Sequence, residues 1–126
     1  MKNHKIKPTD SELKILQVLW TRGPSTVREV HEELNSTRDT GYTTTLKLMQ
    51  IMADKNLVKR DTSSRTHIYE AKISQEATRG NLLNEFLEST FQGSAMSLVM
   101  QTLGNHKASK EELAQIKKLI DRLEQE

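Results

Sequence analysis

The 126-residue sequence predicts a mainly α-helical chain with one small β-hairpin. Hydroxyl residues that suit helix starts repeatedly precede apolar residues at helical spacing. Two short runs rich in strand-forming residues flank a polar turn. No cysteine is present, so neither a disulfide framework nor a thiolate metal site is available to hold a different fold together.

Two helices are expected at the beginning of the chain. Thr9 and Glu12 have the spacing of a capping box, and the apolar residues that follow recur at helical spacing until Gly23-Pro24. Thr26 and Glu29 repeat this spacing ahead of a shorter apolar stripe. A polar loop is then expected over residues 35–41, which contain no apolar side chain.

A third helix is predicted from Tyr42 to about Lys55, and Asn56 suits a left-handed position after it. The residues expected to face the core are Leu46, Met49, Ile51, Met52 and Ala53, and those expected to face away are Thr43, Thr44, Lys47 and Gln50. Strands are predicted for residues 58–61 and 66–71, around the polar turn at 62–65.

The rest of the chain has the pattern of three further helices. Ser74 can cap the first, Gly93-Ser94 separates it from the second, and Ser109 opens a third with another capping box. About 50 helical residues cannot bury their apolar faces alone, so we expect a second copy to cover them. The predicted dimerisation residues are Leu83, Phe86, Leu87, Leu98, Val99, Leu113, Ile116, Ile120 and Leu123.

Three helices followed by a hairpin form the winged helix-turn-helix arrangement, whose third helix enters the major groove of DNA. We therefore predict a winged helix DNA-binding domain at residues 1–72 and a C-terminal helical dimerisation region at 73–126. The expected recognition-helix contacts are Tyr42, Thr43, Thr44, Lys47 and Gln50, with a further hydroxyl from Thr45. The expected backbone or wing contacts are Ser25, Thr26, Arg28, Arg60, Arg65 and His67.

Plainer explanations exist for each group of these residues. Hydroxyl side chains cap helices without binding DNA, and a charged turn can simply be solvated. A winged helix can also serve as a protein–protein interaction module without DNA binding. The charge favours DNA: residues 1–72 carry 13 Lys and Arg against 9 Asp and Glu, whereas residues 73–126 carry 6 against 8.

The residues do not favour an enzyme. The four histidines are scattered without the spacing of metal ligands, no glycine-rich phosphate loop is present, and His31 is expected on a helix surface. We expect no cofactor and no metal. No apolar stretch approaches the length of a membrane span, so no direct membrane insertion and a cytoplasmic location are expected.

Four segments of the chain resemble the penicillinase repressor family, typified by BlaI and MecI and related to the CopY copper regulators. They are residues 8–20, residues 23–30, Gly41-Tyr42-Thr43-Thr44-Thr45-Leu46 and the hairpin ending Ile68-Tyr69. The resemblance implies a homodimer that occupies a palindromic operator and represses transcription. It also implies that Thr43 and Thr44 touch bases, that Lys47 lies one turn further along, and that a membrane sensor protease relieves repression.

The sequence departs from this family in two ways. Where BlaI and MecI are cut at an Asn-Phe bond, Ser97-Leu98-Val99-Met100 is followed here by Gln101-Thr102. Cleavage at that bond and a link to β-lactam resistance are therefore not expected. The cysteine motifs of the copper-responsive branch are missing, so copper sensing by thiolates is excluded.

Overall fold

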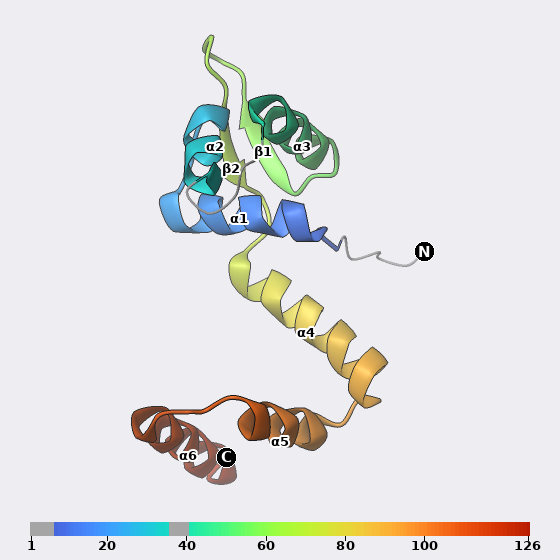
Figure 1. Cartoon of the computed structure of the whole chain (residues 1–126), viewed down its shortest axis with the longest axis vertical. Helices are drawn as coiled ribbons and strands as arrows, with labels where there is room; N and C mark the ends of the chain where they lie inside the picture. Colours follow the sequence, from blue (N-terminus) through green and yellow to red (C-terminus); the bar gives the residue numbers. More distant parts are fainter. Residues whose placement is uncertain (1–6, 36–40) are drawn as a thin grey trace. The chain divides into compact units, whose positions relative to one another are not determined.

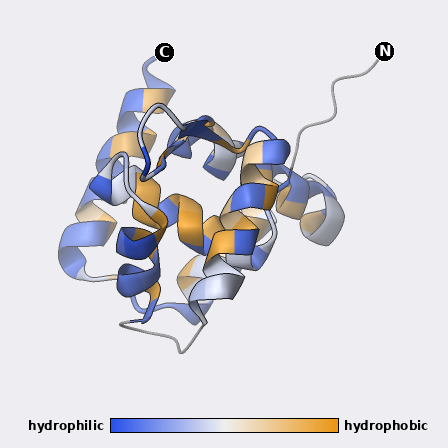
Figure 2. Cartoon of the chain, turned by 90° about the horizontal axis from the view of Figure 1, so that it is seen from above, coloured by the Kyte–Doolittle hydropathy of each residue, from blue (hydrophilic) through white to orange (hydrophobic). Residues whose placement is uncertain are grey.

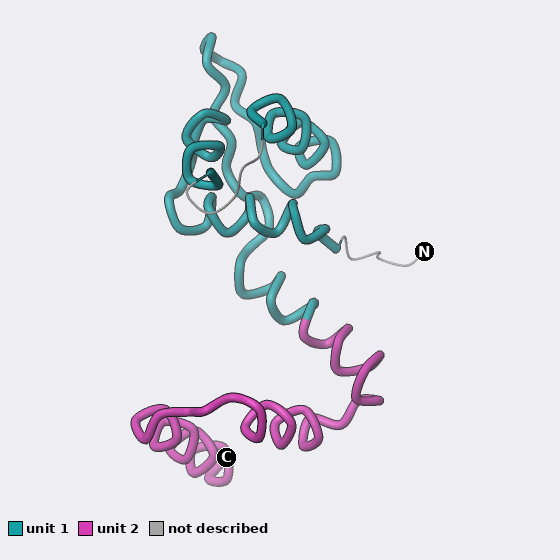
Figure 3. Tube along the Cα trace, viewed as in Figure 1, with its two compact units in different colours: residues 1–82 teal, residues 83–126 magenta. Residues whose placement is uncertain are grey.

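The computed structural model describes residues 7–35 and 41–126 and divides the chain into two compact units, Met1–Leu82 and Leu83–Glu126 (Figures 1 and 3). The elements in order are α1 (Asp10–Arg22), α2 (Val27–Asn35), α3 (Tyr42–Asp54), β1 (Val58–Asp61), β2 (Ile68–Ala71), α4 (Gln75–Phe91), α5 (Ala95–Asn105) and α6 (Lys110–Glu124). This order confirms the prediction of a mainly helical chain with one hairpin. Most of the loop predicted at 35–41 lies outside the described residues.

The starts of α1 and α2 are fixed by hydrogen bonds between close neighbours in the sequence. The Thr9 hydroxyl accepts from the Glu12 amide at 3.2 Å, and the Thr9 amide donates to the Glu12 carboxylate at 3.0 Å. Thr26 and Glu29 form the same reciprocal pair at 3.1 and 2.9 Å. Each pair satisfies amides that a helix start leaves without a partner, so both predicted capping boxes are confirmed.

The core of the first unit lies between α1, α2, α3 and the hairpin. Burying each of its large apolar side chains contributes roughly 1.5–3 kcal/mol. The buried apolar residues are Ile15, Leu16, Leu19, Val27, Val30, Met49, Met52, Leu57, Val58 and Tyr69. Ile51 was expected among them but is 38% exposed, because it lies roughly 200° around the helix from Met49.

The hairpin pairs β1 with β2 in antiparallel register, with Val58 opposite Ala71 and Asp61 opposite Ile68. The second strand begins at Ile68, later than predicted. Asn56, just before the hairpin, has φ 66° and so adopts the left-handed conformation expected of it. The turn from α3 into β1 therefore forms as the sequence indicates.

The second unit contains the end of α4 together with α5 and α6. Ser94 accepts from the Ser97 amide at the start of α5, and Ser109 and Glu112 form the predicted capping box of α6. Neither α5 nor α6, both described in full, buries a residue. Among residues 7–35 and 41–126, no helix has the length and apolar character needed to cross a membrane.

Candidate nucleic-acid interface

The outer face of α3 carries polar side chains that are open to solvent. Thr43, Thr44, Lys47 and Gln50 are exposed, and the Tyr42 ring is 41% exposed at the start of the helix. All five are residues that the sequence singles out for base and phosphate contacts. This face offers hydroxyl, ammonium and amide groups, which can donate to phosphates or to base edges.

Thr45 corrects one of the expectations. Its side chain is fully buried, and its Oγ1 lies 3.1 Å from His31 Nδ1 on α2. Thr45 precedes Met49 by four residues and Met52 by seven, so it shares the core-facing side of α3 with them. The expectation that its hydroxyl faces DNA is wrong, although this spacing could have indicated its position.

The segment before α2 is joined to the hairpin. The Ser25 amide donates to the Tyr69 carbonyl at 2.9 Å, and the Tyr69 amide donates back to the Ser25 carbonyl at 2.8 Å. The Ser25 side chain is fully buried and its Oγ accepts from Arg22 Nε at 3.3 Å. Ser25 therefore holds the start of α2 against the wing, and its hydroxyl is not available as a phosphate contact.

The two other candidates at the start of α2 differ in availability. Thr26 is partly buried and uses its hydroxyl to cap the helix. Arg28 is exposed, and its guanidinium carbon lies 5.7 Å from the centroid of the Tyr42 ring. This cation–π contact holds a positive charge beside the first turn of α3.

The wing carries three further candidates, and the structure leaves all of them exposed. Arg60 lies on β1, Arg65 lies in the turn, and His67 lies just before β2. The turn is ordered by Asp61, whose carboxylate accepts from the Ser63 amide at 2.9 Å. That backbone hydrogen bond is the main reason why the pKa of Asp61 lies below its usual value of 3.8.

A groove of about 620 Å³ brings these three regions together. Its lining includes Arg28 from α2, Tyr42 and Gln50 from α3, and Arg65 and His67 from the wing. The acidic residue in the lining, Glu29, forms an ion pair of 3.3 Å with Arg22. The pKa of Glu29 is lowered first by the backbone hydrogen bond from Thr26 and then by the charge of Arg22, so Glu29 stays ionised and its charge is paired with Arg22. Arg28 and Arg65 then supply the positive charge that the groove presents to an anionic ligand.

The fold is shared with solved structures. A MarR family protein from Bacillus stearothermophilus superposes with a TM-score of 0.51 at 21% sequence identity, covering 98% of this chain and 76% of that one. At this level of identity the likeness concerns the fold alone, and it confirms the predicted winged helix arrangement.

Sequence comparison identifies relatives of known description. The chain is 44% identical to the transcriptional regulator BlaI of Mycobacterium tuberculosis over 61 residues. This match covers 48% of the chain and 44% of the length of that relative. The penicillinase repressors of Staphylococcus aureus and Bacillus licheniformis are 18% and 22% identical over 96% and 90% of this chain, and the matches cover 96% and 88% of their own lengths. The family model described as penicillinase repressor matches residues 8–122, so the resemblance predicted from the sequence is confirmed. The chain belongs to the penicillinase repressor family, a family of transcriptional repressors and not of enzymes.

Proposed function

We propose that this chain represses transcription by binding double-stranded DNA through α3 and the wing. The observation that carries the proposal is the groove in which Arg28, Gln50 and Arg65 meet from three separate parts of the fold. Membership of a repressor family supports it, and so does the exposed polar face of α3. A duplex offers the dense phosphate charge that such a groove can neutralise.

We propose different roles for the residues of α3, which would contact base edges, and for those of the wing and α2, which would contact the DNA backbone or the minor groove. Thr43 and Thr44 lie in the first turn of α3 and would touch base edges, with Tyr42 at the helix start. Lys47 would act one turn further along the groove, and Gln50 about two turns further along. Arg60, Arg65 and His67 would meet the backbone or the adjacent minor groove. Arg28 would contact phosphate from α2, beside the capping residue Thr26; Ser25 is left out because it is buried.

We also propose that residues 1–72 form the DNA-binding domain and that residues 73–126 pair two copies of the chain. The apolar side chains of the second unit support this, since a single copy leaves them in contact with water. Hydrophobic and hydrophilic stretches alternate along the helix that ends at the C-terminus (Figure 2). The exposed members of the predicted dimerisation set are Leu83 (52%), Phe86 (49%), Val99 (50%), Leu113 (41%), Ile120 (50%) and Leu123 (56%), while Leu87, Leu98 and Ile116 are partly buried.

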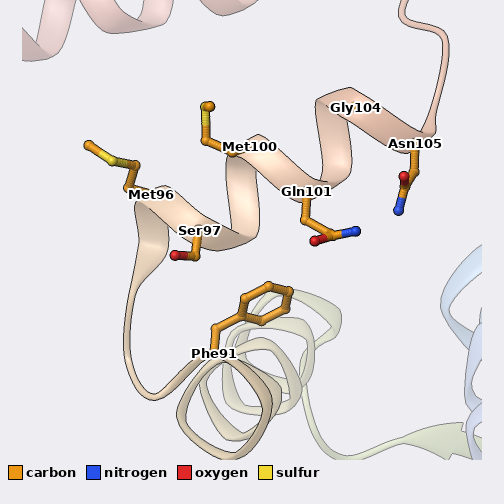
Figure 4. A pocket seen from close by; sticks show the side chains of 7 residues that line it. All are labelled: Phe91, Met96, Ser97, Met100, Gln101, Gly104 and Asn105. Carbon is orange, nitrogen blue, oxygen red and sulfur yellow. The ribbon is translucent and has the colours of Figure 1, made fainter.

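The α5 helix adds two residues that the sequence analysis did not include. In the hollow of about 440 Å³ beside α5, Ser97 and Gln101 point toward the Phe91 ring, whereas Met96 and Met100 point away from it (Figure 4). These methionines are 75% and 70% exposed, so they extend the apolar surface available to a second copy. Two copies related by a two-fold axis would bind a palindromic operator, because each DNA-binding domain (residues 1–72, the headpiece) would meet one half-site.

The resemblance to the family implies that a membrane sensor protease relieves repression, but the position corresponding to the family's cleavage bond lies inside the helix α5. This position is the Gln101-Thr102 bond, and the Thr102 hydroxyl donates to the Leu98 carbonyl at 2.8 Å. A protease that binds extended chain would have to unfold α5 to reach it. We therefore propose that any proteolytic relief acts at another bond.

The salt dependence of duplex binding tests the proposed function. A duplex is selected from a random pool with the purified chain, and its affinity is measured by gel shift at 50 and 200 mM salt, beside a scrambled duplex of the same length. We expect affinity to fall on the order of a thousandfold between these concentrations if about six phosphates are contacted. Failure to select any duplex would favour the interaction-module alternative, and an affinity indifferent to salt would contradict binding through phosphate contacts in the groove.

A further inference from the structure

The N-cap residue of α3 offers no capping side chain, unlike the N-cap residues of α1 and α2. This N-cap residue is Gly41, which makes no side-chain hydrogen bond, and the first turn of α3 contains no acidic residue. By contrast, Thr9 and Thr26 form complete capping boxes at the starts of α1 and α2. The first turn of α3 is thus without a capping side chain from Gly41, and side chains of α2 contact this turn.

His31 of α2 makes one of these contacts. Its Nδ1 lies 3.1 Å from Thr45 Oγ1, and its Nε2 lies 3.0 Å from the side-chain nitrogen of Asn35. Because an amide nitrogen only donates, Nε2 is the acceptor, and a neutral ring then carries its proton on Nδ1. His31 thus donates to the buried Thr45 hydroxyl, and Asn35 fixes the tautomer that allows it.

The same ring also contacts the residue that begins α3. The His31 and Tyr42 rings meet edge to face, with centroids 5.5 Å apart and an angle of 84° between their planes. Arg28, three residues before His31 on α2, lies 5.7 Å from the Tyr42 ring centroid. Tyr42 and Thr45 bracket Thr43 and Thr44, so the contacts from α2 hold the turn that carries the two exposed hydroxyls.

We infer that His31 is a positioning residue that sets the orientation of the first turn of α3 for sequence-specific contact. The inference rests on the proposed function, since it concerns how Thr43 and Thr44 are presented to base edges. His31 itself is partly buried and was expected to be an ordinary surface residue. His31 acts through Thr45 and Tyr42. Its effect should therefore be measured as a change in the discrimination between DNA sequences.

Three single variants, together with the double variant of His31→Ala and Thr45→Val, test this inference. His31→Ala removes the ring, Thr45→Val removes the hydroxyl at nearly constant volume, and Thr45→Ser keeps the hydroxyl. The measured quantity is the ratio of the affinities for a selected duplex and for a scrambled one. A change in the charge of the protein affects binding to both duplexes alike, so the ratio reports on sequence-specific contacts alone. We expect the ratio to fall roughly fivefold to tenfold in His31→Ala and in Thr45→Val, to fall no further in the double variant, and to be retained in Thr45→Ser.

A second measurement does not depend on DNA. Hydrogen exchange of the amides of residues 45–48 should become several-fold faster in His31→Ala than in the wild type, while amides of α1 stay unchanged. Gln17→Ala, an exposed change on α1, serves as the control and should alter neither readout. A wild-type chain that binds no duplex refutes the proposed function. In that case the hydrogen exchange of the amides of residues 45–48 still decides whether His31 orders the first turns of α3. Unchanged discrimination and unchanged exchange in His31→Ala would overturn the inference.

Discussion

Lys55 Nζ donates to Glu12 Oε2 at 2.7 Å and so joins the end of α3 to the start of α1. The Glu12 side chain is 2% exposed and also forms the capping box with Thr9. Together with the His31–Thr45 contact, this ion pair attaches both ends of α3 to the other helices of the headpiece. The orientation of α3 is therefore set by polar contacts as well as by its buried methionines.

Removing the ammonium from this ion pair should destabilise the headpiece. Lys55→Met leaves Glu12 buried without its charged partner, which costs more than the loss of a surface pair. Since Lys55 itself is 39% exposed, water screens part of the effect, and we expect a loss of about 1 kcal/mol in the free energy of unfolding. Urea denaturation measures it, with the exposed Lys14→Met as the matched control. Equal stability of the two variants would show that the pair contributes nothing.

Acid should weaken the headpiece partly through Glu12. Burial alone would raise the pKa of Glu12, but hydrogen bonds from Lys55 and Thr9 and the charge of Lys55 outweigh it, so the pKa lies below 4.5. The ionised carboxylate therefore stabilises the fold above pH 4.5, and this contribution is lost as the pH falls through the lowered pKa of the folded state.

The variant Glu12→Gln should show a shallower loss of stability below pH 4.5 than the wild type, at the cost of lower stability at neutral pH. Thermal unfolding at a series of pH values from neutral to acid follows both effects. Glu124→Gln, at the exposed end of α6, is the control. Parallel pH profiles for Glu12→Gln and the wild type would remove Glu12 from the acid response.

The two halves of the proposed interface should respond differently to alanine. Thr44→Ala removes a base-contacting hydroxyl and should weaken binding to the selected duplex by roughly 1 kcal/mol while leaving scrambled DNA unaffected. Arg65→Ala removes a wing charge and should weaken binding to both duplexes and reduce the salt slope by about one. Gel shifts with both duplexes distinguish these outcomes, and equal losses from the two variants would contradict the assigned roles.

Pairing of two copies should depend on the apolar face of α6. Ile120→Asp places a charge among side chains that include Leu113 and Leu123, so we expect monomers with weakened operator affinity. Lys118→Asp, on the opposite side of the same helix, should leave the assembly intact. Analytical ultracentrifugation gives the mass of each variant. A monomeric variant that retains full affinity would separate DNA binding from pairing.

The sequence predicted local structure well because local structure depends on near neighbours. The boxes formed by Thr9 with Glu12 and by Ser109 with Glu112 each involve residues three apart, and both were predicted. The exposed face of α3 was also predicted, apart from Thr45 and Ile51, because helical spacing determines which residues share a side.

The contacts that could not be predicted join residues far apart in the chain. Glu12 and Lys55 are separated by 43 positions, and His31 and Thr45 by 14. The Ser25–Tyr69 bridge likewise depends on how the hairpin folds back against the start of α2. A pattern of residue types in one sequence specifies no pairing over such separations, so Ser25 was assigned to DNA and His31 to the surface.

Trp20 is the single tryptophan of the chain, and its indole Nε1 donates to the Ile73 carbonyl at 3.0 Å. Trp20 lies on α1 and Ile73 lies just before α4, so the fluorescence of Trp20 reports on folding of the headpiece. Circular dichroism instead sums the signal from every helix. Because α5 and α6 contain no fully buried residue within one copy, their melting should shift with protein concentration while the fluorescence transition shifts little. Melting curves recorded at a series of protein concentrations with both signals can thus report separately on folding within one chain and on assembly of two chains.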